Sequence, residues 1–336
     1  MRAFEIQNKF GLEALTLTER PEPRPGPGQV LVQMRAFSLN YRDLLVVKGL
    51  YNPKLHLPIV PLSDGVGRVA DVGPGVTRVK TGDRVAGIWM QKWVAGELTE
   101  AKARSALGGG GDGVLAEQVV FDQDGVVHVP EHLTDEEAAT LPCAAVTAWH
   151  ALVTEGGIKA GDTVLTQGTG GVSLFALQFA RMAGARVIAT SSSDDKLARV
   201  RALGASDGIN YKATPEWDKR VRDLTGDVGV DHVVEVGGAG TLARSLRAVR
   251  AAGRVSLIGI LTGGSGEVNP LPLLMKNIRL QGILVGSRDM FEAMNRAIAL
   301  HNMRPVLDRV FAFEKVPEAL RYMESGAHFG KIAIHV

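Results

Sequence analysis

The sequence has little of what secreted, membrane-spanning or nucleic-acid-binding proteins depend on. It contains one cysteine, which excludes a disulfide framework and favours a reducing compartment. No run of about 18 uncharged apolar residues occurs, the length that a transmembrane helix needs. Its 38 basic and 36 acidic residues give a formal net charge of +2, whereas nucleic-acid and membrane-surface binders carry a large, clustered basic charge. We therefore expect no nucleic-acid partner and no membrane association.

What the chain does have is glycine, at 40 of its 336 positions. This content, with 45% hydrophobic and 22% charged residues, is typical of a soluble α/β protein. The length exceeds a single typical core, so about two domains are expected. The first residues, MRAFEIQNKF, contain no apolar segment of the kind found in signal peptides, and we expect a cytoplasmic protein.

The first third of the chain and the remainder have different patterns. Residues 21–39 and 65–88 are a proline-rich loop and short strands between turns, which favours a small barrel or sandwich. From about residue 125, strand-like runs alternate with helical ones that end near a glycine. The predicted strands are 163–167, 186–191, 208–211, 230–237, 254–260 and 278–286, and the predicted helices are 171–185, 194–205, 215–226 and 241–253. This alternation predicts βαβ units and a parallel, doubly wound sheet.

A glycine-rich turn, G-T-G-G at residues 168–171, joins the first of these strands to its helix. Bare backbone lets a pyrophosphate approach, and the N–H groups of a helix N-terminus bind it. Ser173 stands where the dinucleotide-binding fingerprint has its third glycine, but the turn opens a βαβ series, as that fingerprint requires. The predicted dinucleotide-binding residues are Gly168, Thr169, Gly170, Gly171 and Val172.

The end of the second strand of the series indicates which dinucleotide is bound. NAD sites usually carry an acidic residue there, whereas this chain has Ser191–Ser193, with Lys196 just beyond. Hydroxyls and an ammonium suit a 2′-phosphate, so Ser191 and Lys196 predict NADP(H) over NAD(H). The alternative is that Ser193 only caps the next helix, whose first turn holds two aspartates. Both can hold, because Ser191 precedes the cap.

Several motifs occur in a recognisable order: NYRDLLVVKGLY and PLSDGVGRVADVGPGVTRVKTGDRV, then LPCAAVTAWHAL, the glycine turn and a terminal GKIAI. Over essentially the whole chain this order resembles the medium-chain dehydrogenase/reductase superfamily, in its zinc-free quinone oxidoreductase and enoyl reductase branch. The resemblance implies an α/β fold with a GroES-like, strand-rich catalytic domain at 1–124 and 287–336. It also implies a Rossmann NADP(H)-binding domain, with a doubly wound parallel sheet, at 125–286.

The zinc-dependent branch of this superfamily binds catalytic zinc through cysteine, histidine and cysteine. By resemblance, Asn40 and Ser63 stand at the first two of these positions, and Cys143 matches the third. Asparagine, serine and one cysteine do not replace that ligand set, so we predict no metal site. Cys143 is then interpreted as a buried small residue, with a catalytic or modified thiol as the alternative.

Without a metal, hydride from NADPH can still reach an electron-poor carbon of a quinone or an enone, and hydrogen-bond donors stabilise the charge that develops on oxygen. In enoyl reductases of this branch a tyrosine after K/Q-G-x lies near the substrate oxygen, and Tyr51 in VKGLY matches it. The alternative is a rim tyrosine without catalytic duty. Asn40 matches a residue beside the nicotinamide and the substrate. Asp43 is expected to hold this loop through backbone bonds.

The resemblance also carries over further cofactor contacts. Thr147 and Asn40 match residues near the nicotinamide, and Tyr211 matches a tyrosine beside the adenosine phosphate. Ile260 and Val285, at the ends of late strands, fall where relatives pass the nicotinamide, although core packing explains them almost as well. The last predicted strand, 278–286, would be an unpaired apolar edge, and relatives pair such edges, so we predict a homodimer.

The predicted function is NADPH-dependent, zinc-independent oxidoreduction of quinones or α,β-unsaturated carbonyls. An NAD(P)-dependent alcohol or aldehyde dehydrogenase is the alternative within the same class. A non-catalytic NADPH-binding protein is the alternative from another class.

Overall fold

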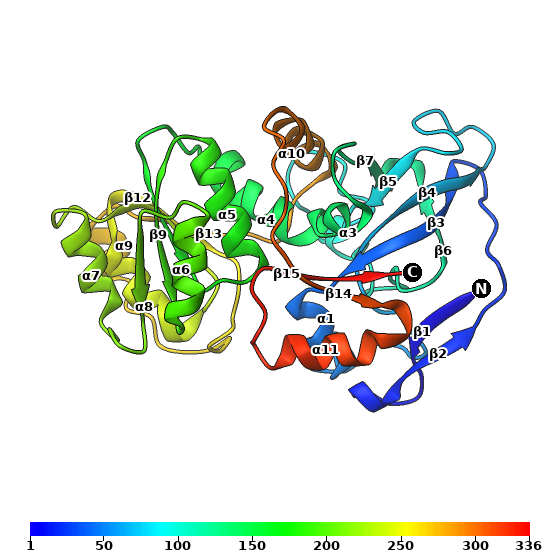
Figure 1. The fold of residues 1–336 in the computed structure, drawn as a ribbon, viewed down its shortest axis with the longest axis horizontal. Helices are drawn as coiled ribbons and strands as arrows, with labels where there is room; N and C mark the ends of the chain where they lie inside the picture. The colour runs from blue at the N-terminus through cyan, green and yellow to red at the C-terminus, as the bar shows by residue number, and fades with distance from the viewer. The chain divides into compact units, whose positions relative to one another are not determined.

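The computed structural model describes all 336 residues and forms two compact units. The first unit comprises Met1–Val146 and Gly286–Val336, and the second comprises Thr147–Val285 (Figure 1). The first boundary therefore lies beyond residue 125, where the βαβ pattern begins in the sequence. The reason is strand pairing, because β7 (Val126–His128) still pairs with β5 (Arg84–Gly87) in the sheet of the first unit.

The first unit is built from strands that are far apart in the sequence. Its main sheet has the order β14-β15-β3-β4-β5-β7, β6 also pairs with β3, and β1 and β2 form a separate ribbon. Its strands are β1 (Arg2–Ile6), β2 (Leu15–Glu19), β3 (Gln29–Ser38), β4 (Asp64–Val72), β5 (Arg84–Gly87), β6 (Gln118–Asp122), β7, β14 (Leu307–Ala312) and β15 (Lys331–His335). Its helices are α1 (Tyr41–Val47), α2 (Glu100–Ala103), α3 (Asp135–Ala139), α10 (Arg288–Leu300) and α11 (Val316–Glu324).

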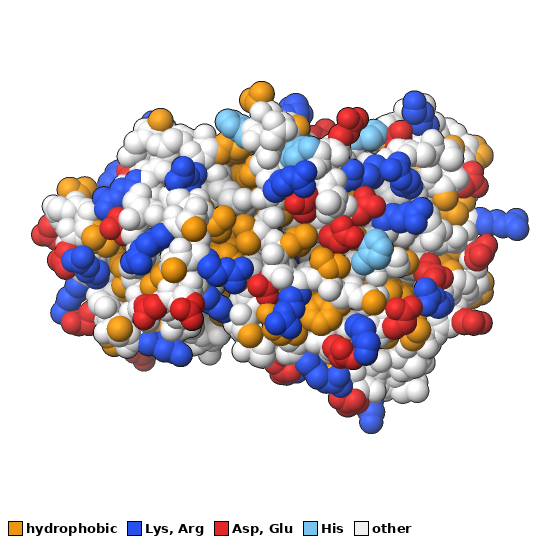
Figure 2. Space-filling model, viewed as in Figure 1, with side chains coloured by type: hydrophobic (Ala, Val, Ile, Leu, Met, Phe, Trp, Pro, Cys, Tyr) orange, Lys and Arg blue, Asp and Glu red, His pale blue; other side chains and the backbone are white.

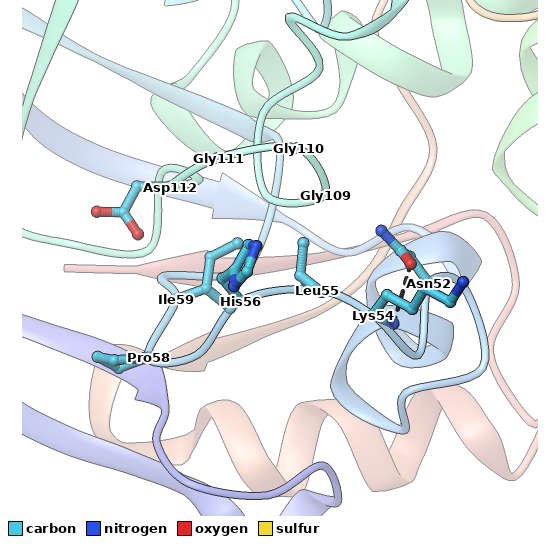
Figure 3. A pocket seen from close by; sticks show the side chains of 10 residues that line it. All are labelled: Asn52, Lys54, Leu55, His56, Pro58, Ile59, Gly109, Gly110, Gly111 and Asp112. Carbon is cyan, nitrogen blue, oxygen red and sulfur yellow. Dashed lines mark hydrogen bonds between the residues drawn. The ribbon is translucent and has the colours of Figure 1, made fainter.

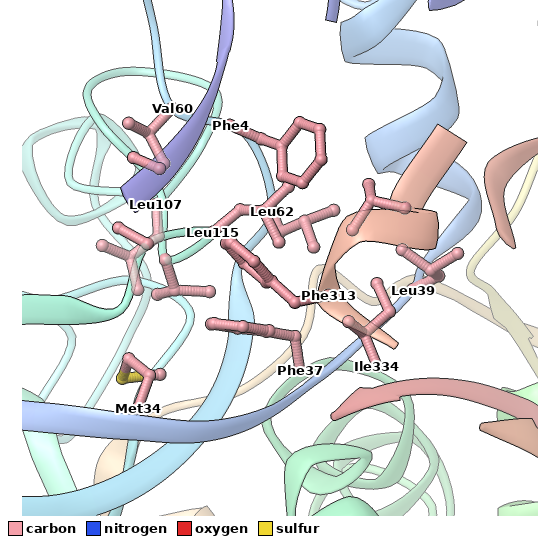
Figure 4. Packing of buried hydrophobic residues seen from close by; sticks show 14 of the residues in the cluster. Phe4, Met34, Phe37, Leu39, Val60, Leu62, Leu107, Leu115, Phe313 and Ile334 are labelled. Atoms are coloured by element: carbon pink, nitrogen blue, oxygen red, sulfur yellow. The ribbon is translucent and has the colours of Figure 1, made fainter. Parts of the chain in front are cut away.

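The C-terminal strand, β15, is an interior strand of the main sheet of this unit, between β14 and β3. β15 pairs antiparallel with β3, with Ala333 opposite Ser38, and parallel with β14. The Leu39 backbone N–H donates to the Ile332 carbonyl at 3.0 Å, which extends the contact to the point where α1 begins. Figure 4 shows the packing beneath, where the Phe37 and Phe313 rings lie 5.9 Å apart. The last strand therefore brings its first residue to the start of α1.

The second unit contains the alternating elements that the sequence predicts. Its strands are β8 (Thr163–Gln167), β9 (Arg186–Ser191), β10 (Asp207–Asn210), β11 (Val230–Glu235), β12 (Val249–Leu257) and β13 (Arg279–Gly282). Its helices are α4 (Val146–Trp149, which begins at the last residue of the first unit), α5 (Gly171–Met182), α6 (Asp194–Ala202), α7 (Trp217–Leu224), α8 (Ala239–Ala248) and α9 (Leu271–Met275). Wide π-helical turns, Leu141–Ala145 and His150–Thr154, flank α4.

The sheet of the second unit is parallel throughout, with the order β10-β9-β8-β11-β12-β13. Numbered along the chain, this strand order is 3-2-1-4-5-6, the order of a dinucleotide-binding Rossmann sheet. Successive strands are added on one side of β8 and then, from β11 on, on its other side, so the strand order reverses between β8 and β11. Both the α/β class and the doubly wound sheet are confirmed. Ligands of such sheets bind at the carboxyl ends of the strands at this reversal.

Several predicted elements of the second unit differ from the observed ones in extent, two of them markedly. The predicted helix 241–253 ends at Ala248, and β12 starts at Val249, where it pairs with Val230 of β11. The alanine-rich sequence favours a helix, but tertiary strand pairing overrides that preference. The predicted strand 278–286 ends at Gly282, where its pairing with β12 also ends, and Val285 beyond it has a φ of +55°, outside the β region.

The surface carries charges of both signs, in agreement with the balanced composition. Lys and Arg side chains lie among Asp and Glu side chains over the face drawn in Figure 2. None of the helices combines the length and the apolar character that crossing a membrane requires.

Candidate functional site

The glycine turn between β8 and α5 is open above its backbone. Gly168 has a φ of +70°, which favours glycine, and Gly170 is the N-cap of the twelve-residue α5. A Cβ atom added at Gly168 or at Gly170 would have no heavy atom within 4 Å. Of the other predicted residues, Thr169 is buried, and Gly171 and Val172 are partly exposed. This open space and the N–H groups of the first turn of α5 fit a pyrophosphate.

Ser173, which stands where the fingerprint has its third glycine, contacts the backbone of the preceding strand. Its hydroxyl donates to the Gln167 carbonyl at 2.6 Å, and its side chain is buried. The serine therefore fastens the first turn of α5 to the end of β8.

Glu235, at the end of β11, was not identified from the sequence. It is fully buried and accepts hydrogen bonds from Gln167 Nε2 at 2.7 Å, from the N–H groups of Gly237 and Gly238, and from the Thr241 hydroxyl. Because Gln167 ends β8, the carboxylate connects the two strands at the reversal of the sheet. The signal available in the sequence was this acidic residue, which directly follows the apolar pair Val233–Val234 near the end of a predicted strand.

Ser191 and Tyr211 lie side by side at the end of β9. The Tyr211 N–H donates to the Ser191 carbonyl at 3.0 Å, and the Tyr211 side chain is 41% exposed. Ser193 Oγ accepts the Lys196 N–H at 3.3 Å, so Ser193 does cap α6, as the alternative reading proposed. Ser191 is the last residue of β9, so the place of an acidic ribose ligand holds a hydroxyl.

The remaining predicted cofactor residues differ in exposure. Thr147 is buried. Val285 is also buried, and its carbonyl lies 2.7 Å from His150 Nδ1. Ile260 is 55% exposed just beyond β12, so packing does not account for it.

In the first unit, Asn40 begins α1 and is held by Asp43. The Asn40 N–H donates to Asp43 Oδ2 at 2.8 Å, and the Asp43 N–H donates back to the Asn40 carbonyl at 2.9 Å. Asp43 is fully buried, and Arg42 Nη2 lies 3.4 Å from its Oδ1. Asp43 therefore holds this loop through backbone bonds, as expected from the sequence.

Lys331 and Asp64 complete a buried polar cluster around Asn40. Lys331 Nζ donates to the Leu39 carbonyl at 2.6 Å and to Asn40 Oδ1 at 2.7 Å, and it lies 3.9 Å from Asp64 Oδ2. The Ser63 hydroxyl donates to Asp64 Oδ1 at 3.0 Å. The sequence reading missed Lys331 and Asp64, although each is a charged residue beside an apolar run.

Burial controls the protonation of this cluster. It raises the pKa of Asp43 to about 6, with Arg42 opposing and Asp64 adding to the rise. Burial also raises the pKa of Asp64, which Lys331 opposes most strongly. The pKa of the Cys143 thiol is raised far above its usual range, chiefly by burial and then by Asp64. Because thiolates are the reactive form, this disfavours a catalytic role for Cys143.

Tyr51 lies in the turn after α1 and is 44% exposed. The Arg42 guanidinium is 5.7 Å from the centre of its ring and 4.6 Å from that of Trp89. A Cβ added to Gly109 would lie 3.4 Å from Tyr51 Cε1, so the glycine loop 108–111 borders this tyrosine.

The same glycine loop lines a pocket of about 330 Å³. Figure 3 shows Leu55 and His56 directed toward Gly109–Gly111 from the segment that follows Tyr51. Tyr51 does not line this pocket, but it borders the glycine loop that does.

The side chains of the first unit that stand at the positions of zinc ligands in the zinc-dependent branch do not fit a zinc ion. Asn40 Oδ1 and the Ser63 hydroxyl are already engaged by Lys331 and Asp64. No group of three His, Cys, Asp or Glu side chains in the chain is arranged to hold a metal ion. A buried ammonium beside Asn40 would also repel a divalent cation.

Comparisons with known proteins cover the whole chain. Residues 26–131 match a family model described as an alcohol dehydrogenase GroES-like domain, and residues 171–299 match one described as a zinc-binding dehydrogenase. A zinc-type alcohol dehydrogenase-like protein of Schizosaccharomyces pombe, C1773.06c, is 43% identical, covering 97% of this chain and 96% of its own.

Solved structures give the same result. The crystal structure of an NAD-dependent alcohol dehydrogenase is 35% identical with a TM-score of 0.91, covering 100% of both chains. The mycobacterial protein Rv1454c complexed with NADPH is 26% identical with a TM-score of 0.83, and a mycobacterial quinone oxidoreductase is 27% identical with a TM-score of 0.82. Each of these two matches covers 100% of both chains.

Proposed function

Because the chain belongs to the medium-chain dehydrogenase/reductase superfamily, an oxidoreductase family whose members bind a nicotinamide cofactor, we propose that it is an NADPH-dependent, zinc-independent reductase of quinones or α,β-unsaturated carbonyls. The observation that carries the proposal is the polar cluster of the first unit, where Lys331 engages Asn40 at the place of a metal ligand. A reduction there has to rely on hydrogen-bond donors.

The proposed roles follow from that chemistry. A bound NADPH supplies hydride to the electron-poor carbon of the substrate, and negative charge then develops on the conjugated oxygen. The Asn40 side chain carries an amide N–H group, which is buried beside the Asp64 carboxyl, and the Tyr51 ring borders the glycine loop that lines the pocket. Both are donors that would stabilise this oxygen. The cofactor would be held by the residues Gly168–Val172, with Thr147, Ile260, Val285 and Tyr211 as further contacts.

The choice of NADPH rests on the end of β9. Ser191 ends the strand, and Lys196 follows in the first turn of α6, so a 2′-phosphate would meet a hydroxyl and an ammonium. The NADPH-complexed mycobacterial relative supports this choice, whereas the NAD-dependent relative makes NADH the competing cofactor to test.

The test is a screen of NADPH and NADH oxidation with quinones, enones and aldehydes, and of alcohol oxidation with NADP⁺ and NAD⁺, on protein stripped of metal. We expect turnover of a quinone or an enone with NADPH and no gain from added zinc. Alcohol oxidation that requires zinc would show a zinc-type dehydrogenase instead. NADPH binding without turnover of any substrate would support a non-catalytic binding protein.

We also propose that the protein is a homodimer. Strand β13 pairs with β12 on one side only, and it ends the sheet. All its residues are exposed, and Leu280 and Leu284 present apolar surface there. A strand edge that is exposed and unpaired tends to pair with another chain. Light scattering at micromolar concentration should give about twice 35.8 kDa, and the mass of one chain would contradict the proposal.

A further inference from the structure

The parallel sheet of the second unit consists of two halves that meet where the strand order reverses. Strands β8, β9 and β10 form one half, here called the β8 half, and β11, β12 and β13 form the other, the β11 half. In sheets of this order a dinucleotide binds across the boundary, at the carboxyl ends of the strands, with one mononucleotide on each half. The glycine turn 168–171 follows β8, and the segment 236–238 follows β11. A bound dinucleotide would therefore lie across these two segments.

The Glu235 carboxylate, at the end of β11, connects the two halves. Its Oε1 accepts the N–H groups of Gly237 at 2.7 Å and Gly238 at 2.9 Å, and its Oε2 accepts Nε2 of Gln167 at 2.7 Å. Gln167 is the last residue of β8 and directly precedes the glycine turn. One carboxylate therefore holds the segment after β11 and the residue before the turn in a fixed relation.

Hydroxyl groups complete the hydrogen bonds of this carboxylate. Ser245 Oγ donates to Glu235 Oε2 and accepts Gln167 Nε2 at 2.8 Å, and the Thr241 hydroxyl donates to Oε1 at 2.6 Å. Glu235 and Ser245 are fully buried, and Gln167 is almost fully buried. The desolvation of a buried carboxylate offsets much of what its hydrogen bonds contribute to stability, but a fully satisfied network accepts only one arrangement of its donors. The network therefore specifies geometry more than it adds stability.

The segment held by Glu235 also fixes the loop that follows β12. The Gly237 carbonyl accepts the Thr262 N–H at 2.8 Å and the Thr262 hydroxyl at 2.9 Å. Ile260 lies two residues before Thr262 in this loop and is more than half exposed. The place of this apolar side chain, at the end of the β11 half, therefore depends on the same carboxylate.

We propose that Glu235 is a positioning residue for the dinucleotide. Its carboxylate fixes the spacing between the glycine turn of the β8 half and the segment 236–238 of the β11 half, so a ligand that touches both halves meets a site that is already formed. A ligand that occupies only one half does not depend on this spacing. The inference rests on the part of the proposed function in which a nicotinamide dinucleotide binds at these strand ends, and on no particular substrate.

The test compares the Kd of NADPH with that of adenosine 2′,5′-bisphosphate, its adenosine half, by titration calorimetry. Glu235→Gln keeps the size of the side chain but replaces one acceptor oxygen by an NH₂ group. It should raise the NADPH Kd by about tenfold, because binding then has to order the two halves, and leave the Kd of the bisphosphate within about twofold. An unchanged NADPH Kd, or equal weakening of both ligands, would overturn the proposal.

Gln167→Met breaks the same connection from the other side. It removes the donor on β8 and leaves the bonds of Glu235 to Gly237 and Gly238 in place. We expect the same selective loss of NADPH affinity, and this variant carries the test if Glu235→Gln does not fold. An NADPH Kd equal to that of the unmodified protein would contradict a connection through Gln167.

A double variant, Gln167→Glu with Glu235→Gln, exchanges donor and acceptor. The amide on β11 can then donate to the carboxylate on β8, and the Ser245 hydroxyl can turn to donate to the new carboxylate. The NADPH Kd should return to within about threefold of that of the unmodified protein. Gln167→Glu alone places two carboxylates against each other and should not recover. A folded double variant that binds NADPH no better than Glu235→Gln would overturn the proposal.

Asp218→Asn is the matched control. Asp218 is another buried carboxylate of the second unit, but it joins α7 to α8 by accepting Arg247 Nε at 2.6 Å and bonds to neither β8 nor β11. This variant should lose stability and keep the Kd values of both ligands. A loss of NADPH affinity equal to that of Glu235→Gln would show a general effect of changing a buried carboxylate and would overturn the proposal.

These binding experiments separate the inference from the proposed reaction. If the variants behave as expected and the protein turns over no quinone or enone, the positioning role of Glu235 is right and the proposed reaction is wrong. If turnover is found but the NADPH Kd of Glu235→Gln is unchanged, the reaction is right and the positioning role is wrong. If the protein prefers NADH, the same comparison is made with NADH and 5′-AMP and judged in the same way.

Discussion

The two regions that are proposed to carry the function, one in each unit, use different chemical groups: mainly backbone in one and side chains in the other. The region of the second unit that is proposed to hold the cofactor, here called the cofactor cradle, is mainly backbone, supplied by the consecutive residues 168–172 at the start of one helix. The cluster of the first unit consists of side chains from four separate places, at Asn40, Asp43, Asp64 and Lys331. A backbone site is open to any cofactor that carries a pyrophosphate, whereas a side-chain cluster sets the chemistry. Substitutions should therefore separate binding from turnover.

The largest effect is expected in the cradle, from Gly168→Asp. A side chain at a φ of +70° is strained, and a carboxylate in the open space above the turn would repel the pyrophosphate. Losing about two hydrogen bonds to a charged group, at roughly 1.5–3 kcal/mol each, would raise the NADPH Kd by about 10²–10⁴-fold. Titration calorimetry measures this directly.

Gly226→Asp controls for strain in that experiment. Gly226 also has a positive φ and open space beside it, but it follows α7. It should lose a similar amount of stability and keep its NADPH affinity. Equal weakening of NADPH binding in both variants would mean that the glycine turn has no special role.

The next effect belongs to the first unit, where Tyr51→Phe should act on turnover alone. Removing one donor to a developing oxyanion typically costs roughly 10²–10³-fold in kcat. The NADPH Kd should stay unchanged, since the cradle belongs to the other unit. Tyr322→Phe is the control, because it removes a hydroxyl that donates to Asp308 at 2.6 Å elsewhere in the same unit. Full activity of Tyr51→Phe would leave Tyr51 as a rim residue and Asn40 as the donor.

A smaller and more selective effect is expected at the ribose end of the cradle. Lys196→Ala should weaken NADPH by about 1.5–3 kcal/mol, or roughly 10–150-fold, and leave NADH unaffected. Lys219→Ala, an exposed lysine that pairs with Glu216, should change neither Kd. If the unmodified protein binds NADH as tightly as NADPH, the assignment of the cofactor is wrong.

The last effect concerns the stability of the first unit, not binding or turnover, and its dependence on pH. Burial raises the pKa of Asp43 from 3.8 in the unfolded chain to about 6, so between these values the folded protein binds more protons. Stability should therefore fall as pH rises from about 4 to 6, by on the order of 2–3 kcal/mol. Urea unfolding at several pH values should show this fall in the unmodified protein and a weaker fall in Asp43→Asn. The remainder is expected from Asp64, whose pKa is raised in the same direction.

Asp83 gives the opposite sign as a control. The pKa of its carboxylate is lowered, first by the Lys80 backbone N–H and then by His128, so its contribution is lost as pH falls. Asp83→Asn should leave the fall in stability between pH 4 and 6 at least as steep. If Asp43→Asn and Asp83→Asn weakened the fall in stability equally, the pH dependence would come from carboxylates over the whole surface and not from the buried cluster.

Most of the second unit could be predicted from its sequence because its signals are local. The strands 163–167 and 186–191 have the predicted bounds, and the glycine turn lies between β8 and α5 as predicted. The errors arose where a partner strand decided the conformation. Val249–Gly253 has helical composition, but Val249 pairs with Val230 of β11, and the segment belongs to β12. The last strand ends at Gly282, and Val285 beyond it has a φ of +55°.

The sequence by itself determined the fold class and the backbone of the cofactor cradle, since hydrophobic periodicity and glycine act over a few neighbouring residues. It also placed Asn40 and Ser63 where a zinc enzyme has ligands, and so indicated chemistry without a metal. Only the tertiary structure brought Lys331 to Asn40, across 291 residues of sequence, and Glu235 to Gln167. Such contacts depend on strand pairing between distant segments, and no local pattern records which charged side chain a buried amide will meet.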